Sequence, residues 1–298
     1  MAMGTRCDVV LFHDDLDFAE RLSLSIQKEV GYYEFLLSRY QDGSPVSRFN
    51  AMNPGEIFKP GDTLWDVILE CKKYNELTRG AFDITAFRVI KLWKDKRLED
   101  RVSEEELKIA LTKSGFDKLK FDNNSKTIEK LVEGIELDFG AIGKGIALDF
   151  IKKLLIKQNV KVGFISFGES SVLALGKHPA GDYWPVGIPN PYSKQDILHV
   201  FNVVDGFVTT SGTILNTYRR NIGHRVHIID LRNGNAIING ALVSVKSSSA
   251  VLGEVISTSW MILDDAEKEE LKKEIKDIEI FSAGFAGDIL EKKFVIEL

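Results

Sequence analysis

The chain has 298 residues, a mass of 33.5 kDa and a formal charge of −5, from 44 acidic and 39 basic side chains. The pI near 5.7 and the lack of a basic block argue against a general nucleic-acid binder, and 10% aromatic residues argue against disorder. Two cysteines, Cys7 and Cys71, are too few for a disulfide framework or a cysteine-rich zinc site.

The apolar runs and the N-terminal segment bear on where the protein works. The longest apolar runs, such as residues 9–12, are far shorter than a membrane span. Residues 1–14 lack a charged region followed by an apolar stretch, so we expect no signal peptide. We therefore expect a cytoplasmic protein, or a periplasmic or membrane-anchored one if a leader has been removed.

The first predicted elements are a strand and a long helix. Residues 7–13 predict a short strand, and Asp14 and Asp15 can cap a helix that runs to about Tyr40. Apolar residues recur in that helix at helical spacing, namely Phe18, Leu22, Ile26, Val30 and Tyr33. A loop is expected at 41–45. The next helix opens on the capping-box pattern Thr63-Leu64-Trp65-Asp66 and ends by Gly80. A further helix runs from Ser103-x-x-Glu106 to Gly115, and a hairpin over 116–131 turns at 122–124.

The second half of the chain predicts strands around a strong helix. Residues 136–139 end a strand, and a glycine-rich turn leads into a helix from about Ile142, whose buried stripe is Ile142, Ile146, Phe150, Ile151, Leu154 and Leu155. The remaining expected elements are strands and turns over 163–187, a hairpin over 226–238 around Asn233-Gly234, a strand at 242–245, a helix over 249–263 and a charged surface helix over 267–276. This mixed order predicts an α+β fold or a complex α/β fold.

The glycine-rich turn is the first segment that suggests chemistry. In Asp138-Phe139-Gly140-Ala141-Ile142-Gly143-Lys144-Gly145, a strand passes through the turn into the start of a helix. Free N–H groups, the positive end of the helix dipole and Lys144 suit a phosphate. The spacing is neither that of a P-loop nor that of the dinucleotide fingerprint, so phosphate binding and a plain tight turn are about equally favoured.

Other residue sets suggest a site less strongly. Glu254 and Thr258 share one face of a predicted helix and offer hard oxygen ligands suited to Mg²⁺, although such pairs are common on helix surfaces. His227 could act as a general base, but a half-buried hairpin histidine is the commoner case. Asp83, in Gly80-Ala81-Phe82-Asp83-Ile84-Thr85, and the polar turn Thr210-Ser211-Gly212 could each contact a ligand or simply end an element. No G-x-S-x-G or H-E-x-x-H pattern is present, which removes the common hydrolase and zinc-protease classes.

Taken in order, these segments resemble one known family, the FAD:protein FMN transferases or ApbE-like flavin transferases. The resemblance runs from Met3 to about Leu263 and rests on the order of the motifs more than on any single one. The matching segments are Met3-Gly4-Thr5, Ser47-Arg48-Phe49-Asn50, Gly80 to Thr85, Leu92-Trp93, Asp138 to Gly145 with Asp149, Gly176 to Pro191, Thr210-Ser211-Gly212, His227-Ile228-Ile229-Asp230 and Gly234.

The resemblance implies a reaction, a fold and a set of partners. Such enzymes transfer FMN from FAD to a threonine hydroxyl of an acceptor protein, release AMP and use Mg²⁺ at the pyrophosphate. The acceptor would be a flavin-bearing protein of an electron-transport complex or a soluble reductase, with no nucleic acid involved and no membrane span in this chain. The implied fold is a single α+β domain over residues 1–298, with two T-fold-like halves packed around the flavin site. Hydrolysis of FAD to FMN and AMP, or FAD binding without catalysis, are the alternatives.

The resemblance also implies roles for residues of this chain. The metal ligands would be the Ala141 carbonyl, Glu254 and Thr258, and His227 would remove the threonine proton. The expected FAD contacts are Met3, Ala81, Phe82, Asp83, Asp138, Lys144 and Ile228.

Three departures from the family pattern mark this chain as a divergent member. Glu254 stands where the family usually has Asp, and the carboxylate is one methylene longer. Asp230 is followed by Leu231 rather than Pro, and Phe167-Gly168-Glu169-Ser170 replaces a frequent Gly-Gly-Asn or Gly-Gly-Asp segment.

Overall fold

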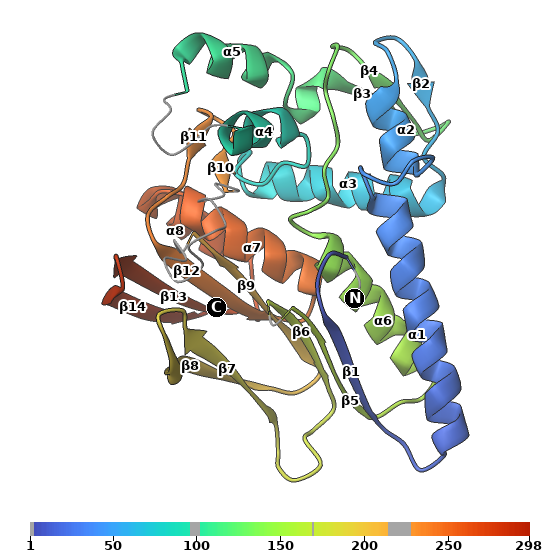
Figure 1. The fold of residues 1–298 in the computed structure, drawn as a ribbon, viewed down its shortest axis with the longest axis vertical. Coiled ribbons are helices and arrows are strands. Elements are labelled where there is room, and N and C mark those ends of the chain that lie inside the picture. Colours follow the sequence, from blue (N-terminus) through green and yellow to red (C-terminus); the bar gives the residue numbers. More distant parts are fainter. Residues whose placement is uncertain (1–2, 96–101, 169, 214–227) are drawn as a thin grey trace.

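An antiparallel sheet organises the molecule (Figure 1). The structure, a computed structural model, describes residues 3–95, 102–168, 170–213 and 228–298. Seven strands form the main sheet, in the spatial order β1 (Cys7–Phe12), β5 (Val162–Phe167), β6 (Ser171–Leu175), β9 (Gly206–Gly212), β12 (Ala241–Ser247), β13 (Glu279–Ala286) and β14 (Ile289–Glu297). Neighbouring strands throughout this order are antiparallel.

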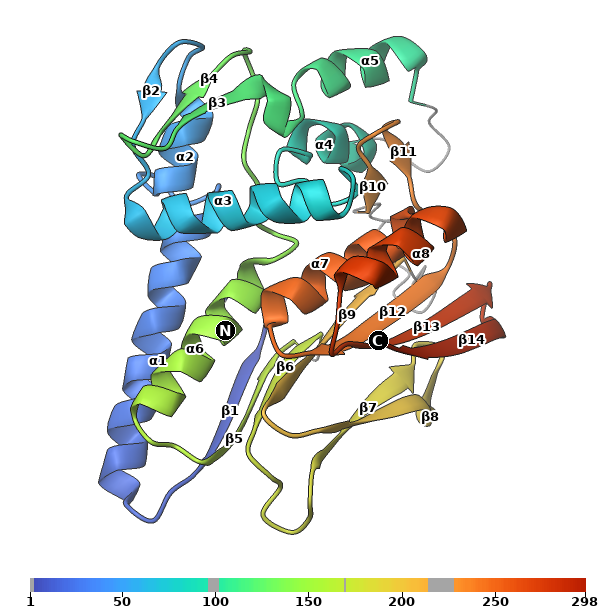
Figure 2. The same cartoon turned by 180° about the vertical axis from the view of Figure 1, so that it is seen from behind.

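Helices cover one face of this sheet (Figures 1 and 2). They are α1 (Leu16–Leu37), α6 (Gly143–Lys157), α7 (Ala250–Ile262) and α8 (Asp265–Glu274). Asp15 caps α1, and the helix buries a stripe that includes Leu22, Ile26 and Val30. Helix α7 is buried along nearly its whole length, because it lies between the sheet and α6. The largest hydrophobic core among the described residues includes α1, α6 and the inner strands β5 and β6.

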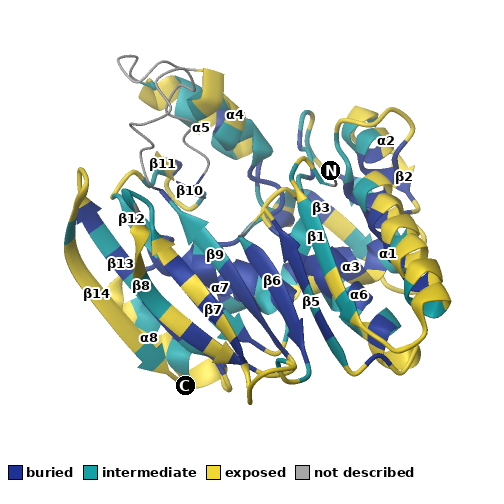
Figure 3. Cartoon of the chain, turned by 60° about the horizontal axis from the view of Figure 1, so that its bottom comes forward, coloured by how far each residue is buried: buried dark blue, intermediate teal, exposed yellow. Residues whose placement is uncertain are grey.

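A hairpin covers part of the opposite face. It consists of β7 (Trp184–Asn190) and β8 (Ser193–Val203) and lies below the sheet in Figure 1. Burial alternates along β7, so Trp184, Val186 and Ile188 point inward, as the period of a strand requires (Figure 3). These side chains pack with Phe201 and Phe281 into a second core.

The remaining elements form a cap at one end of the helix layer, at the top of Figure 1. They are α2 (Pro45–Ala51), α3 (Asp62–Leu77), α4 (Phe87–Asp95), α5 (Glu104–Thr112), the short 3₁₀ helix η1 (Phe116–Lys118), β2 (Ile57–Phe58), β3 (Leu119–Asp122), β4 (Thr127–Lys130), β10 (Ile229–Asp230) and β11 (Asn235–Ala236). Three of these strands pair in the order β2-β4-β3, and β10 pairs with β11. Helix α4 is tied to the β10–β11 hairpin, because Trp93 Nε1 donates to the Gly234 carbonyl at 2.9 Å.

The α+β class expected from the sequence is confirmed. The predicted capping box at Ser103 and Glu106 is present at the start of α5, and the hairpin over 116–131 is present as β3 and β4. The predicted capping box at 63–66 is wrong: α3 starts at Asp62, and Gly61 precedes it without any side-chain cap. A glycine can enter a helix from a positive φ, 82° here, so the entry needs no hydroxyl. Among the described helices, none combines the length and the apolar character needed to cross a bilayer.

Candidate functional site

A cavity of about 450 Å³ lies between α4, a helix of the cap, and the helix layer. The first turn of α6, the side of α7 and the end of β9 form its other walls. It gathers residues from distant parts of the sequence. Its lining includes these residues predicted for the site: Asp83, Asp138, Ala141, Lys144, Ile228 and Thr258. Tyr40, Phe87, Lys94 and the polar turn over 210–212 complete much of the wall. These six sequence-predicted residues therefore share one space.

The first turn of α6 presents a positive end to this cavity. No side chain caps the helix at Ile142, and the first turn contains no acidic residue. Lys144 adds a cation there. The preceding turn is fixed by Asp138, whose Oδ1 accepts from the Gly140 N–H at 2.8 Å and whose Oδ2 accepts from Arg39 at 3.2 Å. Such a helix start attracts anionic groups, phosphates among them.

Helix α7 brings a buried carboxylate, Glu254, next to this positive end. The Glu254 side chain is 5% exposed, and its Oε1 accepts from Ser171 Oγ at 2.6 Å and lies 3.7 Å from Lys144 Nζ. Its Oε2 is buried and finds no hydrogen-bond partner within the described part of the chain. Burial raises the pKa of the Glu254 carboxyl, while Lys144, Ser171 and the Gly145 N–H oppose that rise.

Thr258 lies one helical turn beyond Glu254 and lines the cavity. Its hydroxyl is 3.0 Å from Ser211 Oγ, which is also 2.8 Å from Ser257 Oγ. Within the described ranges, no group of three or more His, Cys, Asp and Glu side chains could hold a metal ion. The predicted ligands Glu254, Thr258 and the Ala141 carbonyl offer oxygen donors only, which suit a hard cation. The unpartnered Glu254 oxygen fits such an ion, because a buried charged oxygen requires a partner.

Close packing of α6 against α7 places Lys144 beside Glu254. A Cβ atom on Gly145 would lie about 3.0 Å from the backbone of Ala250 and Val251, so a larger residue would require the two helices to move slightly apart. Asp149 also connects α6 to α7, because its carboxylate accepts from Ser249 Oγ at 2.7 Å and from the Ala250 N–H at 2.9 Å. The α6 side chain thus caps the N-terminus of α7.

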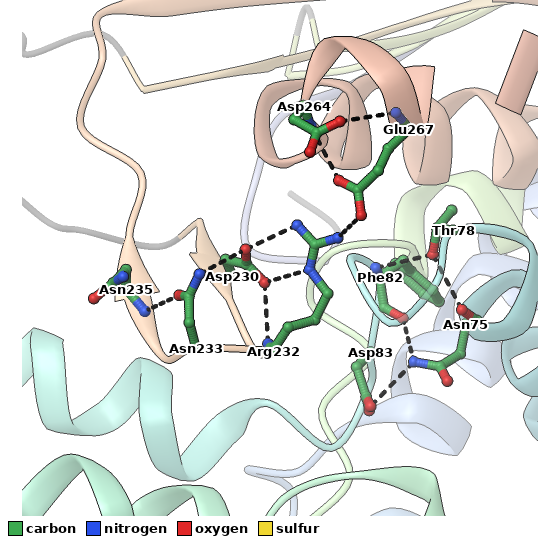
Figure 4. A network of polar contacts seen from close by, with 10 residues as sticks. All are labelled: Asn75, Thr78, Phe82, Asp83, Asp230, Arg232, Asn233, Asn235, Asp264 and Glu267. Carbon is green, nitrogen blue, oxygen red and sulfur yellow. Dashed lines mark hydrogen bonds and ion pairs between the residues drawn. The ribbon is translucent and has the colours of Figure 1, made fainter. Parts of the chain in front are cut away.

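Asp83 lies at the cavity wall on the loop that follows α3. Its Oδ2 accepts from Asn75 at 3.1 Å (Figure 4). Its Oδ1 accepts from both the N–H and the hydroxyl of Thr85 at 2.7 Å. Burial raises the pKa of Asp83 to about 6, against the opposing effect of the bonds from Thr85 and Asn75. The neighbouring Ala81 and Phe82 have buried side chains that belong to the hydrophobic cores and do not line the cavity.

Ion pairs and hydrogen bonds between side chains stabilise the turn after Ile228. Arg232 donates to the Asp230 carboxylate through Nε at 2.8 Å and Nη2 at 2.9 Å, and Asn233 donates to it at 3.1 Å (Figure 4). Arg232 also pairs with Glu267 of α8 at 2.5 Å. This network of charged and polar side chains fixes the β10–β11 turn around Leu231.

Four predicted residues are not among those that line this cavity: Met3, Ala81, Phe82 and Glu254. Met3 lines an adjoining cavity of about 290 Å³ that shares Tyr40, Asp138, Gly140 and Lys144 with the first. His227, the predicted base, lies outside the described residues. The roles assigned to the predicted residues all remain predictions.

Tyr40 and Ser171 are among the residues of the site that were missed from the sequence. Tyr40 is exposed and lines both cavities, and its only sequence signal is an aromatic residue just beyond the end of a helix. Ser171 contacts Glu254 across 83 positions, and nothing in the local sequence indicates that contact.

Comparison with known proteins gives a consistent family. The model of the ApbE family matches residues 3–282. The FAD:protein FMN transferase of Klebsiella pneumoniae (strain 342) is 24% identical over 280 residues, which cover 91% of this chain and 79% of the relative. The enzyme of the same name from Salmonella typhimurium is 24% identical, with 90% and 79% covered.

Solved structures share the fold. The flavin transferase ApbE from Vibrio cholerae superposes with a TM-score of 0.83 at 22% identity, covering 99% of this chain and 94% of that one. The ApbE protein from Thermotoga maritima gives a TM-score of 0.82 at 23% identity, covering 98% and 94%.

Proposed function

Because this chain belongs to the ApbE family, we propose that it transfers FMN from FAD to a threonine hydroxyl of an acceptor flavoprotein, with Mg²⁺, and releases AMP. The curated relatives carry the name of this activity. In this proposal the whole chain acts as one domain. The acceptor is a flavin-bearing protein of an electron-transport complex or a soluble reductase.

One observation carries the proposal. The uncapped start of α6 and Lys144 line the cavity, and Lys144 Nζ lies 3.7 Å from the buried Glu254 carboxylate of α7, whose Oε2 has no hydrogen-bond partner among the described residues. A pyrophosphate brings concentrated negative charge, which a helix N-terminus and a lysine stabilise. A cation held by Glu254, Thr258 and the Ala141 carbonyl would stabilise the charge that develops on the phosphates.

The chain's own residues supply binding and proton transfer. Lys144 and the α6 N–H groups bind the phosphates, and Asp83 and Asp138 hydrogen-bond to the adenosine or isoalloxazine groups. Ile228 and Met3 complete the FAD contacts, and the segment 81–83 contributes its backbone, because the Ala81 and Phe82 side chains are buried in the cores.

The reaction itself needs a nucleophile, a base and a leaving group. The acceptor threonine oxygen attacks the FMN phosphorus, the bond to the bridging oxygen breaks, and AMP leaves with the electron pair. His227 takes the threonine proton. The nucleophile comes from the partner, which accounts for the lack of an internal hydrolase elbow in the sequence.

An assay of AMP release tests the proposal and separates it from the alternatives. The protein is incubated with FAD and Mg²⁺, with and without an acceptor protein, and AMP is quantified by chromatography. We expect AMP only with the acceptor present, and a large loss when EDTA replaces Mg²⁺. AMP and FMN released without acceptor would identify an FAD pyrophosphatase. FAD that stays intact under every condition would identify a flavin-binding protein and overturn the proposal.

A further inference from the structure

The Glu254 carboxylate is held in one orientation by a serine from the sheet. Ser171 Oγ donates to Glu254 Oε1 at 2.6 Å, and both side chains are buried. Lys144 also faces Oε1, at 3.7 Å. The Ser171 hydrogen bond and the Lys144 ion pair both fall on Oε1, and among the described residues Oε2 has no hydrogen-bond partner.

The serine is fixed by the sheet and the glutamate by the helix. Ser171 opens β6, an inner strand whose first residue pairs with Phe167 of β5 and Thr209 of β9. Helix α7 lies close to these strands, because a Cβ atom on Gly253 would come within 2.5 Å of Thr209 Oγ1. This close approach lets the residue after Gly253 reach the start of β6.

A glutamate needs such a support more than an aspartate does. Its side chain has one more rotatable bond, while Mg²⁺ requires near-ideal octahedral geometry. Groups that hydrogen-bond to a metal ligand orient it, and their loss typically weakens metal affinity by about 10- to 100-fold.

We infer that Ser171 is a positioning residue that occupies one oxygen of Glu254 and thereby leaves the other directed to a divalent cation. The inference rests on the proposed function, because it needs a cation at Glu254. It assigns Ser171 no contact with the flavin and no part in proton transfer.

Binding of Mn²⁺ to the full chain without FAD tests the inference, with free Mn²⁺ measured by electron paramagnetic resonance. The variants are Ser171→Ala, Glu254→Gln, the double variant and Ser259→Ala. Ser259 is a matched control, because it is a buried serine of α7 whose hydroxyl has no partner. We expect Ser171→Ala to weaken Mn²⁺ affinity by about 10-fold or more and Ser259→Ala to leave it unchanged. In the Glu254→Gln background, loss of Ser171 should have no further effect.

The outcomes separate this inference from the proposed function. If Ser171→Ala binds Mn²⁺ as tightly as the wild type while Glu254→Gln loses it, the positioning role is wrong and the cation site stands. If the wild type binds no Mn²⁺, or Glu254→Gln binds it equally well, both the cation site and the inference fail. Should Ser171→Ala be unfolded at the assay temperature, Ser171→Cys replaces it. Its weaker donor should give an intermediate loss, and wild-type affinity in that variant would overturn the inference.

Discussion

At the scale of single residues, protonation of Asp83 in the cavity wall affects the stability of the folded protein. Its pKa of about 6 lies above the value of an unfolded aspartate, so the folded state holds the proton more tightly. The stabilisation from this group is therefore complete at low pH, and it is lost as the pH rises from about 4 through 6. The shift corresponds to at most about 3 kcal/mol.

Replacing Asp83 with asparagine should remove this dependence, since an amide does not titrate and its oxygen still accepts from Thr85. Urea unfolding of both proteins between pH 4 and pH 8 is the measurement. Relative to Asp83→Asn, the wild type should lose stability between about pH 4 and 6, and the difference should be constant above that range. A difference independent of pH throughout would show that Asp83 has an ordinary pKa.

Residues of the site could be predicted from the sequence only where neighbouring residues form a recognisable motif. The turn over 138–145 and the pair Glu254 and Thr258 have recognisable spacings, and the fold brings them to one place. Ser171 and Tyr40 have no such pattern, because their positions depend on how strands and helices pack over long separations. The local periodicity of a sequence does not indicate which residues pack together when they are far apart in the chain.

At the scale of elements, the contact between α6 and α7 depends on Gly145. A methyl group there would push against the backbone at the start of α7. We expect Gly145→Ala to lower the free energy of unfolding by about 1–3 kcal/mol, despite the better helix propensity of alanine. It should also weaken Mn²⁺ binding, because Lys144 and Glu254 shift relative to each other.

Gly143→Ala is the matched control, because a Cβ atom at Gly143 meets nothing within 4 Å. It should leave stability unchanged or raise it by up to about 1 kcal/mol. Chemical denaturation of both variants measures their free energies of unfolding for comparison. Equal stability of Gly145→Ala and Gly143→Ala would contradict the close approach of the two helices.

Elements with a clear amphipathic period were predicted well, and exposed or short ones were not. Helices α1 and α6 match their predicted stripes, because each buries one face in a core. Strand β14 was missed: it forms the edge of the sheet, most of its residues are exposed, and its sequence ILEKKFVIE is rich in charge. Helix α4 has nine residues and buries only Val89, so it too gives little periodic signal.

At the scale of the whole molecule, the cavity lies between the cap and the helix layer. FAD and Mg²⁺ bound there would contact both parts in the folded state only. Ligand at about 100 times its Kd stabilises a fold by about 2.7 kcal/mol, which for a chain of this size raises Tm by roughly 5 °C.

Thermal unfolding with FAD and Mg²⁺, with FAD and EDTA, and with Mg²⁺ alone measures this coupling. The largest rise in Tm should come from the full combination, because the cation and the phosphates stabilise each other's binding. A Tm that FAD leaves unchanged at saturating concentration would argue against a flavin site between these parts.

The central claim is that FMN becomes covalently attached to a partner protein. Intact-mass spectrometry of an acceptor flavoprotein tests it most directly, after incubation with this protein, FAD and Mg²⁺. The account predicts that the acceptor gains one FMN less one water, in step with AMP release, and that an acceptor with valine in place of its threonine gains nothing. An acceptor that keeps its original mass while FAD is consumed would contradict the account.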